Sequence, residues 1–116
     1  MPNPVVHFEI LGKDQQLLET FYKSVFDWQI SPIQGDYSLV NTGSGIGGGI
    51  GAMGENREHV IFYVAVADVD AALATIESKG GKTAFGPHPI PDGGIIAGFT
   101  DPEGHLIGLV QGPAGM

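Results

Sequence analysis

The feature that most constrains this chain is an internal repeat, in which one pattern of strand and helix occurs twice. A strand-like run at Val5–Leu11 precedes a helical stretch at Asp14–Phe26, and a second run at His59–Val66 precedes a helical stretch at Asp68–Lys79. Three short strand-like runs with Gly-rich turns follow each helical stretch. A repeat of this length means that one supersecondary unit is used twice. The sequence therefore predicts two tandem β-α-β-β-β modules.

Local signals mark where the helices begin, pack and end. Asp14 and Asp68 can accept hydrogen bonds from free backbone N–H groups at a helix start. Gly80 is expected to end the second helix in the left-handed conformation. Apolar residues recur at spacings of three and four, which is typical of a helix that packs on a sheet. They are Leu17, Leu18, Phe21, Tyr22, Val25 and Phe26 in the first helix and Val69, Ala72, Leu73 and Ile76 in the second.

These patterns predict an α+β fold in which the two modules form a cupped mixed sheet with the helices on the convex face. The later strands are expected at 28–33, 37–41 and 46–53 and at 83–85, 95–100 and 106–111. Prolines at 87, 89 and 91 favour a loop over 86–93, and residues 112–116 are expected to fray. One domain is expected over 1–116, with module one at about 4–53 and module two at about 58–111. The residues expected to be buried are Phe21, Phe26, Leu73 and Ile76.

Composition argues against several partners. The net charge is −8 and Arg57 is the only arginine, so binding of nucleic acid phosphates is not expected. The chain has no cysteine for a disulfide or a thiolate metal site. No apolar stretch approaches the roughly 20 residues that span a bilayer, and the first residues lack the pattern of a signal peptide. We therefore expect no membrane partner and a cytoplasmic location.

Two local motifs have structural explanations. Gly43-x-Gly45-x-x-Gly48 matches the dinucleotide-binding pattern, but no helical periodicity follows it, so a glycine-rich turn and strand is expected. Asp101-Pro102-Glu103-Gly104 is a strong turn signal, and its carboxylates are expected to form the turn. His88 and His105 are expected to face solvent.

His7 and His59 lie at equivalent positions in the first strands of the two modules. Alternation places His7 and Glu9 on one face of their strand, and His59 and Tyr63 on the matching face of theirs. Two imidazoles, a carboxylate and a phenol converging on a cavity would suit a divalent metal or acid–base chemistry, with Glu9 as the candidate catalytic residue. The same residues also fit two histidines hydrogen-bonded or solvated at strand ends, which spacing alone favours.

The chain resembles the vicinal oxygen chelate superfamily, the group of glyoxalase I, bleomycin-resistance proteins and extradiol dioxygenases. The resemblance rests on the repeat, on Val5-Val6-His7-Phe8-Glu9-Ile10, on Phe21-Tyr22-x-x-Val25-Phe26-x-Trp28, and on Asp101-Pro102-Glu103-Gly104-His105-x-x-Gly108-Leu109. It implies a homodimer of cupped sheets and one divalent metal, such as Zn, Mn, Fe or Ni. The implied first-strand ligands are His7 and His59. The implied fourth-strand ligands, usually glutamates, fall on Gly49 and Gly108, so the carboxylate half of the set is absent.

Two functions follow as hypotheses. In the first, a glyoxalase-like protein binds a small organic molecule in a concave cleft without a complete metal site. The missing carboxylates favour it, with Gly49 and Gly108 as a bare floor and Trp28, Tyr37, Tyr63 and Phe99 as aromatic walls. In the second, a metal-dependent lyase, isomerase or dioxygenase acts on vicinal oxygens. The sequence does not identify the ligand, nor whether the cleft closes within one chain or across two.

Overall fold

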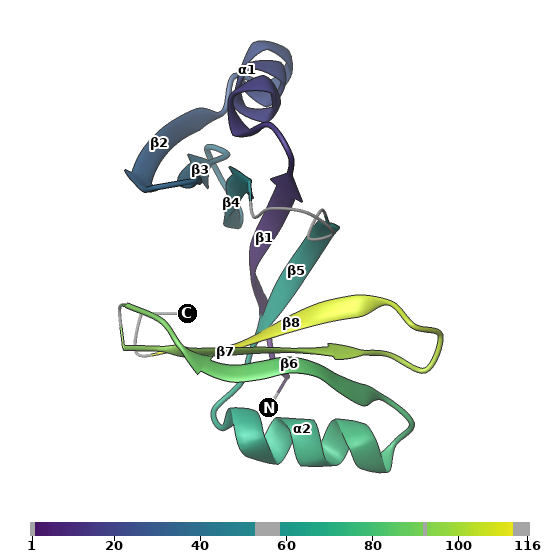
Figure 1. Cartoon of the computed structure of the whole chain (residues 1–116). Helices are drawn as coiled ribbons and strands as arrows, with labels where there is room; N and C mark the ends of the chain where they lie inside the picture. Colours follow the sequence, from purple (N-terminus) through teal and green to yellow (C-terminus); the bar gives the residue numbers. More distant parts are fainter. Residues whose placement is uncertain (1, 53–58, 92, 113–116) are drawn as a thin grey trace. The chain divides into compact units, whose positions relative to one another are not determined.

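The computed structural model describes residues 2–52, 59–91 and 93–112 of the 116-residue chain. These residues form ten elements in the order of two β-α-β-β-β repeats, as predicted (Figure 1). The first repeat is β1 (Val5–Gly12), α1 (Gln15–Phe26), β2 (Gln29–Gln34), β3 (Tyr37–Asn41) and β4 (Gly47–Ala52). The second is β5 (His59–Ala65), α2 (Val69–Ser78), β6 (Lys82–Pro89), β7 (Ile95–Thr100) and β8 (Leu106–Gln111).

Contacts divide the chain into two units. The N-terminal unit comprises residues 7–61, and the C-terminal unit comprises residues 62–116 together with 1–6. The strand order is β2-β3-β4-β1 for the first repeat and β5-β8-β7-β6 for the second. In each, the first and last strands of the repeat are parallel and the other pairs are antiparallel. This mixed α+β architecture confirms the predicted fold class, while the cupping of the two modules stays a prediction.

In the C-terminal unit, α2 packs on its sheet through an apolar core. Asp68 caps the helix by accepting a hydrogen bond from the Ala71 N–H at 3.1 Å. Gly80 follows the helix with φ of 103°, as predicted. The buried core residues are Val69, Leu73, Ala97 and Leu109, with Ile76 half-buried against them.

In the N-terminal unit, α1 is capped in the same way but buries no side chain completely. Asp14 accepts from the Leu17 N–H at 3.0 Å. The expectation that Phe21 and Phe26 are buried is wrong, because they are 54% and 55% exposed. The helix instead rests partly on polar contacts: Ser38, fully buried on β3, donates to Glu19 at 2.7 Å. Neither described helix has the length and apolar character required to cross a membrane.

The prediction of a loop over 86–93 is also wrong in its first part, because β6 continues to Pro89. Its pairing with β7 is interrupted between Thr83 and Phe85 and again between Phe85 and His88. The strand lies last in the order of its repeat, and an edge strand tolerates prolines because one side needs no ladder N–H groups. The Gly43–Gly48 segment leads into β4 rather than a helix, as expected.

Candidate functional site

A polar cluster of four side chains lies in the N-terminal unit, on the sheet face opposite α1. Alternation along β1 turns His7 and Glu9 to this face, while Phe8 turns to the α1 face and contacts Trp28 at a ring distance of 5.5 Å. Tyr37 from β3 and His59 from β5 complete the cluster. The structure thus brings together His7, Glu9 and His59, which the sequence predicted to share one face.

A continuous set of hydrogen bonds connects the polar cluster. His7 Nε2 lies 3.0 Å from the Tyr37 hydroxyl, which donates to Glu9 Oε2 at 3.0 Å. His59 Nε2 lies 3.3 Å from Glu9 Oε1. The Glu9 side chain is only 14% exposed and that of His59 is 25% exposed. The cluster therefore holds a largely buried carboxylate with a contact on each oxygen.

Hydrogen counting sets the direction of these bonds. A tyrosine hydroxyl has one hydrogen, and here it is donated to Glu9. The Tyr37 oxygen can then only accept from His7, which requires the hydrogen of His7 to be on Nε2. Since a carboxylate oxygen accepts, His59 Nε2 donates to Glu9. Glu9 is therefore the common acceptor on which the donors of the cluster converge.

Burial lowers the pKa of His7 below its ordinary value of 6.5, because the charged imidazolium loses hydration. The nearby Glu9 carboxylate opposes this effect and raises the pKa, but burial is the larger cause. His7 is thus neutral at pH 7, which agrees with its role as a single N–H donor to Tyr37.

Tyr37 also covers the glycines of β4. The phenol ring lies across Gly49 and Gly51, and Tyr37 is the register partner of Gly51 on the neighbouring strand. A Cβ atom added at Gly49 would lie inside the contact distance of the Tyr37 hydroxyl. The expected bare glycine floor is therefore wrong, since an aromatic ring occupies the space above the main chain.

The C-terminal unit repeats this arrangement with a different tyrosine. Tyr63 of β5 is the register partner of Gly108 on β8, and its ring occupies the space that a Cβ at Gly108 would need. Phe99 lines a cavity of about 310 Å³ in this unit. Its lining residues are Asn3, Val64, Val66, Ala72, Thr75, Ile76, Phe99 and Leu109.

Trp28, predicted as a wall of the ligand pocket, lies in the aromatic cluster beside α1. Its ring stacks on Tyr22 at 5.3 Å and contacts Phe26 at 5.3 Å. With Phe8 on the same side, this cluster lies on the face opposite His7 and Glu9. Trp28 is therefore not brought together with the polar cluster.

The donor set does not fit the divalent-metal site that the family resemblance implies. Gly49 and Gly108 supply no side-chain ligand, and tyrosine rings fill the space above both. The Tyr37 hydroxyl lies between His7 and Glu9, and each Glu9 oxygen has a hydrogen-bond contact. Within the described part of the chain, no three His, Asp or Glu side chains are grouped to hold a metal ion.

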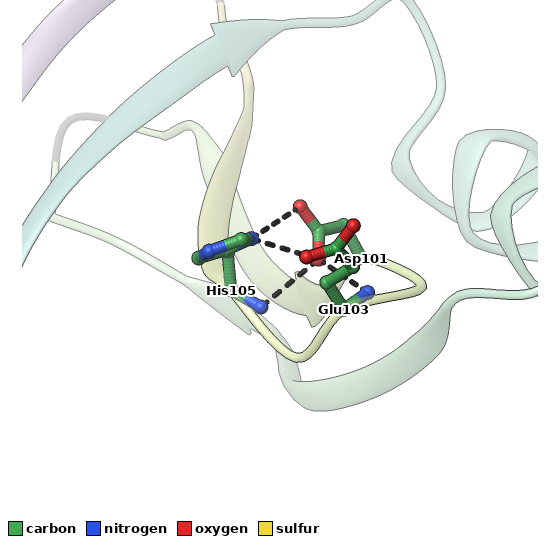
Figure 2. Close-up of polar contacts among 3 residues, drawn as sticks. All are labelled: Asp101, Glu103 and His105. Atoms are coloured by element: carbon green, nitrogen blue, oxygen red, sulfur yellow. Dashed lines mark hydrogen bonds and ion pairs between the residues drawn. The ribbon is translucent and has the colours of Figure 1, made fainter.

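Asp101 forms the turn that the sequence predicted, and its side chain also contacts His105 (Figure 2). Asp101 Oδ1 accepts from the backbone N–H groups of Glu103 at 2.9 Å and His105 at 3.0 Å. His105 Nδ1 lies 2.9 Å from Asp101 Oδ2. The bond from the His105 N–H is the largest cause that lowers the pKa of Asp101 below 3.8. These contacts close a turn on the surface, where His105 is exposed.

The position of Tyr37 between His7 and Glu9 is the feature of the polar cluster that the sequence did not predict. Tyr37 was predicted only as an aromatic wall, because its distance from His7 and Glu9 along the chain hides the contact. One signal was present: the strand after Tyr37 consists largely of glycine, and an antiparallel neighbour of such a strand often supplies an aromatic ring to cover it.

Comparison with known proteins agrees with this fold. The family model of the Glyoxalase/Bleomycin resistance protein/Dioxygenase superfamily matches residues 5–109. The chain is 30% identical over 108 residues to the protein named "Putative glyoxylase CFP32" in Mycobacterium tuberculosis (strain CDC 1551 / Oshkosh). The match covers 84% of this chain and 41% of that protein, so the chain spans about two fifths of the relative's length.

Solved structures with a similar fold are more distant in sequence. The methylmalonyl-CoA epimerase of Streptomyces coelicolor matches with a TM-score of 0.70 and 20% identity, over 98% of this chain and 97% of that chain. A glyoxalase/bleomycin resistance protein/dioxygenase superfamily member from Vibrio splendidus 12B01 matches with a TM-score of 0.69 and 15% identity, over 96% and 100%. Likenesses at this level of identity concern the fold alone.

Proposed function

Because the chain belongs to the Glyoxalase/Bleomycin resistance protein/Dioxygenase superfamily, we propose that it binds a small organic molecule at the polar cluster without a complete metal site. The observation that carries the proposal is the position of Tyr37. Its hydroxyl bridges His7 and Glu9, and its ring fills the space above Gly49. The polar cluster would then recognise its ligand through side-chain hydrogen bonds rather than through a bound metal.

Charge narrows the class of ligand that we propose. Lys82 on β6 is the only lysine or arginine in any described strand, so the described strands that carry the cluster offer no lysine or arginine to an anionic ligand. The net charge of −8 also opposes the approach of anions. We therefore propose a neutral or cationic ligand that donates hydrogen bonds to Glu9. A coenzyme A derivative such as 2-nitronate-propionyl-CoA, which the Streptomyces coelicolor epimerase structure contains, does not suit these charges.

The direct test is a binding screen with neutral, cationic and anionic fragments, detected by ligand-observed NMR. Hits that compete with one another and are lost in Glu9→Gln support the site. His105→Ala is the matched control, because His105 is an exposed histidine in the turn of the other unit. A screen in which anionic fragments dominate, or in which Glu9→Gln changes nothing, contradicts the proposal.

The second candidate is a metal-dependent lyase, isomerase or dioxygenase. The observation in its favour is that His7, Glu9 and His59 belong to one hydrogen-bonded network. Tight metal binding to the native state would raise the free energy of unfolding by RT ln(1 + [L]/Kd), where [L] is the concentration of free metal. This is about 2.7 kcal/mol when the metal concentration is a hundred times Kd. A large drop in Tm on adding chelator, abolished by His7→Ala or His59→Ala, would contradict the metal-free site and favour this second function.

We also propose that the protein acts as a homodimer in the cytoplasm. An apolar stripe on α1 supports the dimer: Leu17 is 66% exposed and Phe21 and Val25 are each 54% exposed. Small domains often bury such surface against a second copy. Light scattering should give a dimer mass for the native chain and a monomer mass for Leu17→Lys/Phe21→Lys. A native monomer at tens of micromolar would contradict it.

A further inference from the structure

Two equivalent glycines of the repeat, Gly49 on β4 and Gly108 on β8, each lie under a tyrosine ring. The rings come from different elements, because Tyr37 belongs to the third strand of its repeat and Tyr63 to the first strand of the other. The backbone at neither glycine has a positive φ of the kind that disfavours side chains. At both places glycine therefore leaves room for a tyrosine ring, and no unusual backbone conformation calls for it.

The space above Gly49 can hold one group only. A Cβ at position 49 would collide with the hydroxyl, Cζ and Cε2 of Tyr37. Gly51 also lies under the ring, since a Cβ added there would lie 2.9 Å from Tyr37 Cδ1 and 2.7 Å from the Asp36 carbonyl oxygen. A side chain at position 49 would therefore require the Tyr37 side chain to leave this place.

We propose that Tyr37 and Gly49 form an exclusive pair in which the tyrosine takes the place of a side chain from residue 49 and keeps divalent metals from His7 and Glu9. The proposal rests on the proposed function and deepens it, because it names the residue that keeps divalent metals out of the site. The Tyr37 hydroxyl engages His7 Nε2 and one oxygen of Glu9, which are the atoms a metal would need. The ring at the same time excludes the carboxylate that would complete the ligand set.

The test compares five proteins by Co²⁺ titration, followed by the visible d–d absorption of the bound ion: wild type, Tyr37→Phe, Tyr37→Ala, Gly49→Glu, and Tyr37→Ala/Gly49→Glu. The double variant should bind Co²⁺ more tightly than every other protein, with a Kd lower by more than about 10-fold. A factor of about 10 is the smallest change in metal affinity that outer-shell groups typically cause. Gly49→Glu alone should be destabilised, because its side chain meets Tyr37, and circular dichroism would detect this.

Tyr37→Phe and Tyr37→Ala keep the proposal falsifiable if the double variant does not fold. Tyr37→Phe keeps the ring but removes the hydroxyl from His7 and Glu9, so it should strengthen Co²⁺ binding slightly. Tyr37→Ala also removes the ring and should strengthen Co²⁺ binding more. Equal binding by these two variants, or a folded double variant no better than Tyr37→Ala, would overturn the exclusive pair. Stoichiometric tight Co²⁺ binding by wild type would instead overturn the proposed function.

Discussion

The two units use the same order of elements but stabilise their helices differently. In the C-terminal unit α2 packs on a core of Val69, Leu73, Ala97 and Leu109. In the N-terminal unit α1 buries no residue completely, and Ser38 and Glu19 form a polar contact beneath it. The N-terminal unit also carries the polar cluster on its other face. The comparison teaches that the C-terminal unit packs its helix on an apolar core, while the N-terminal unit accommodates polar groups on both faces of its sheet.

The largest effect should come from the core of the C-terminal unit. Leu73→Ala is expected to lower the free energy of unfolding by about 2–5 kcal/mol, since it leaves a cavity under α2. The matched variant Leu18→Ala removes a half-buried leucine of α1 and should cost clearly less. Urea unfolding followed by circular dichroism measures both. An equal or larger cost for Leu18→Ala would remove the contrast between the two helices.

Gly49→Ala and Gly108→Ala should come next, at about 1–3 kcal/mol each, because the new methyl group meets a tyrosine ring. Similar costs would show that the two units share this packing device. The control is Gly49→Ala in a Tyr37→Ala background, where the cost of the added methyl group should largely disappear. A cost that persists without the ring would place the strain elsewhere.

A smaller effect is expected at the polar contact under α1. Ser38→Ala removes the donor to Glu19 and the acceptor for Gln15, and should lower the free energy of unfolding by about 1 kcal/mol. Ser78→Ala on α2 is the control, because that hydroxyl is exposed and its loss should stay within about 0.5 kcal/mol. Equal effects at the two serines would mean that the buried network contributes no specific stability.

Acid should affect the two units in different pH ranges, with the smallest effects of the series. The pKa of His7 is lowered in the folded state, so the unfolded chain binds the proton first and stability falls as pH drops below 6.5. The pKa of Asp101 is also lowered, so its contribution holds above 3.8 and is lost as pH falls toward the folded-state pKa. Urea midpoints measured across pH should no longer decline just below pH 6.5 in His7→Gln. In Asp101→Asn they should decline less below pH 3.8. A His7→Gln profile that parallels wild type would refute the first assignment.

The order of elements could be predicted because its signals are local. Asp14 and Asp68 cap their helices through contacts three residues away, and the expected strand at 37–41 agrees with β3. The expected 46–53 strand agrees with β4 through Ala52, and position 53 lies outside the described residues. The extent of β6 was missed, because its prolines are tolerated only as a result of its place at the edge of the strand order.

The site could be predicted only in part, since its contacts depend on register between distant strands. Alternation placed His7 and Glu9 on one face correctly. The position of Tyr37 over Gly49 depends on how β3 pairs with β4, which periodicity does not specify. The predicted burial of Phe21 and Phe26 was wrong because periodicity identifies an apolar face of a helix but not how much of that face its sheet covers, and both residues are more than half exposed.

The position of Trp28 gives the protein a natural fluorescent reporter. It is the only tryptophan of the chain and lies wholly within the N-terminal unit, stacked on Tyr22 with 9° between the rings. Emission excited at the red edge of its absorption therefore follows that unit alone, while the ellipticity of the backbone follows both. If the emission changes at a lower urea concentration than the ellipticity, the N-terminal unit unfolds before the C-terminal unit, and the reverse order of the two signals would show the opposite.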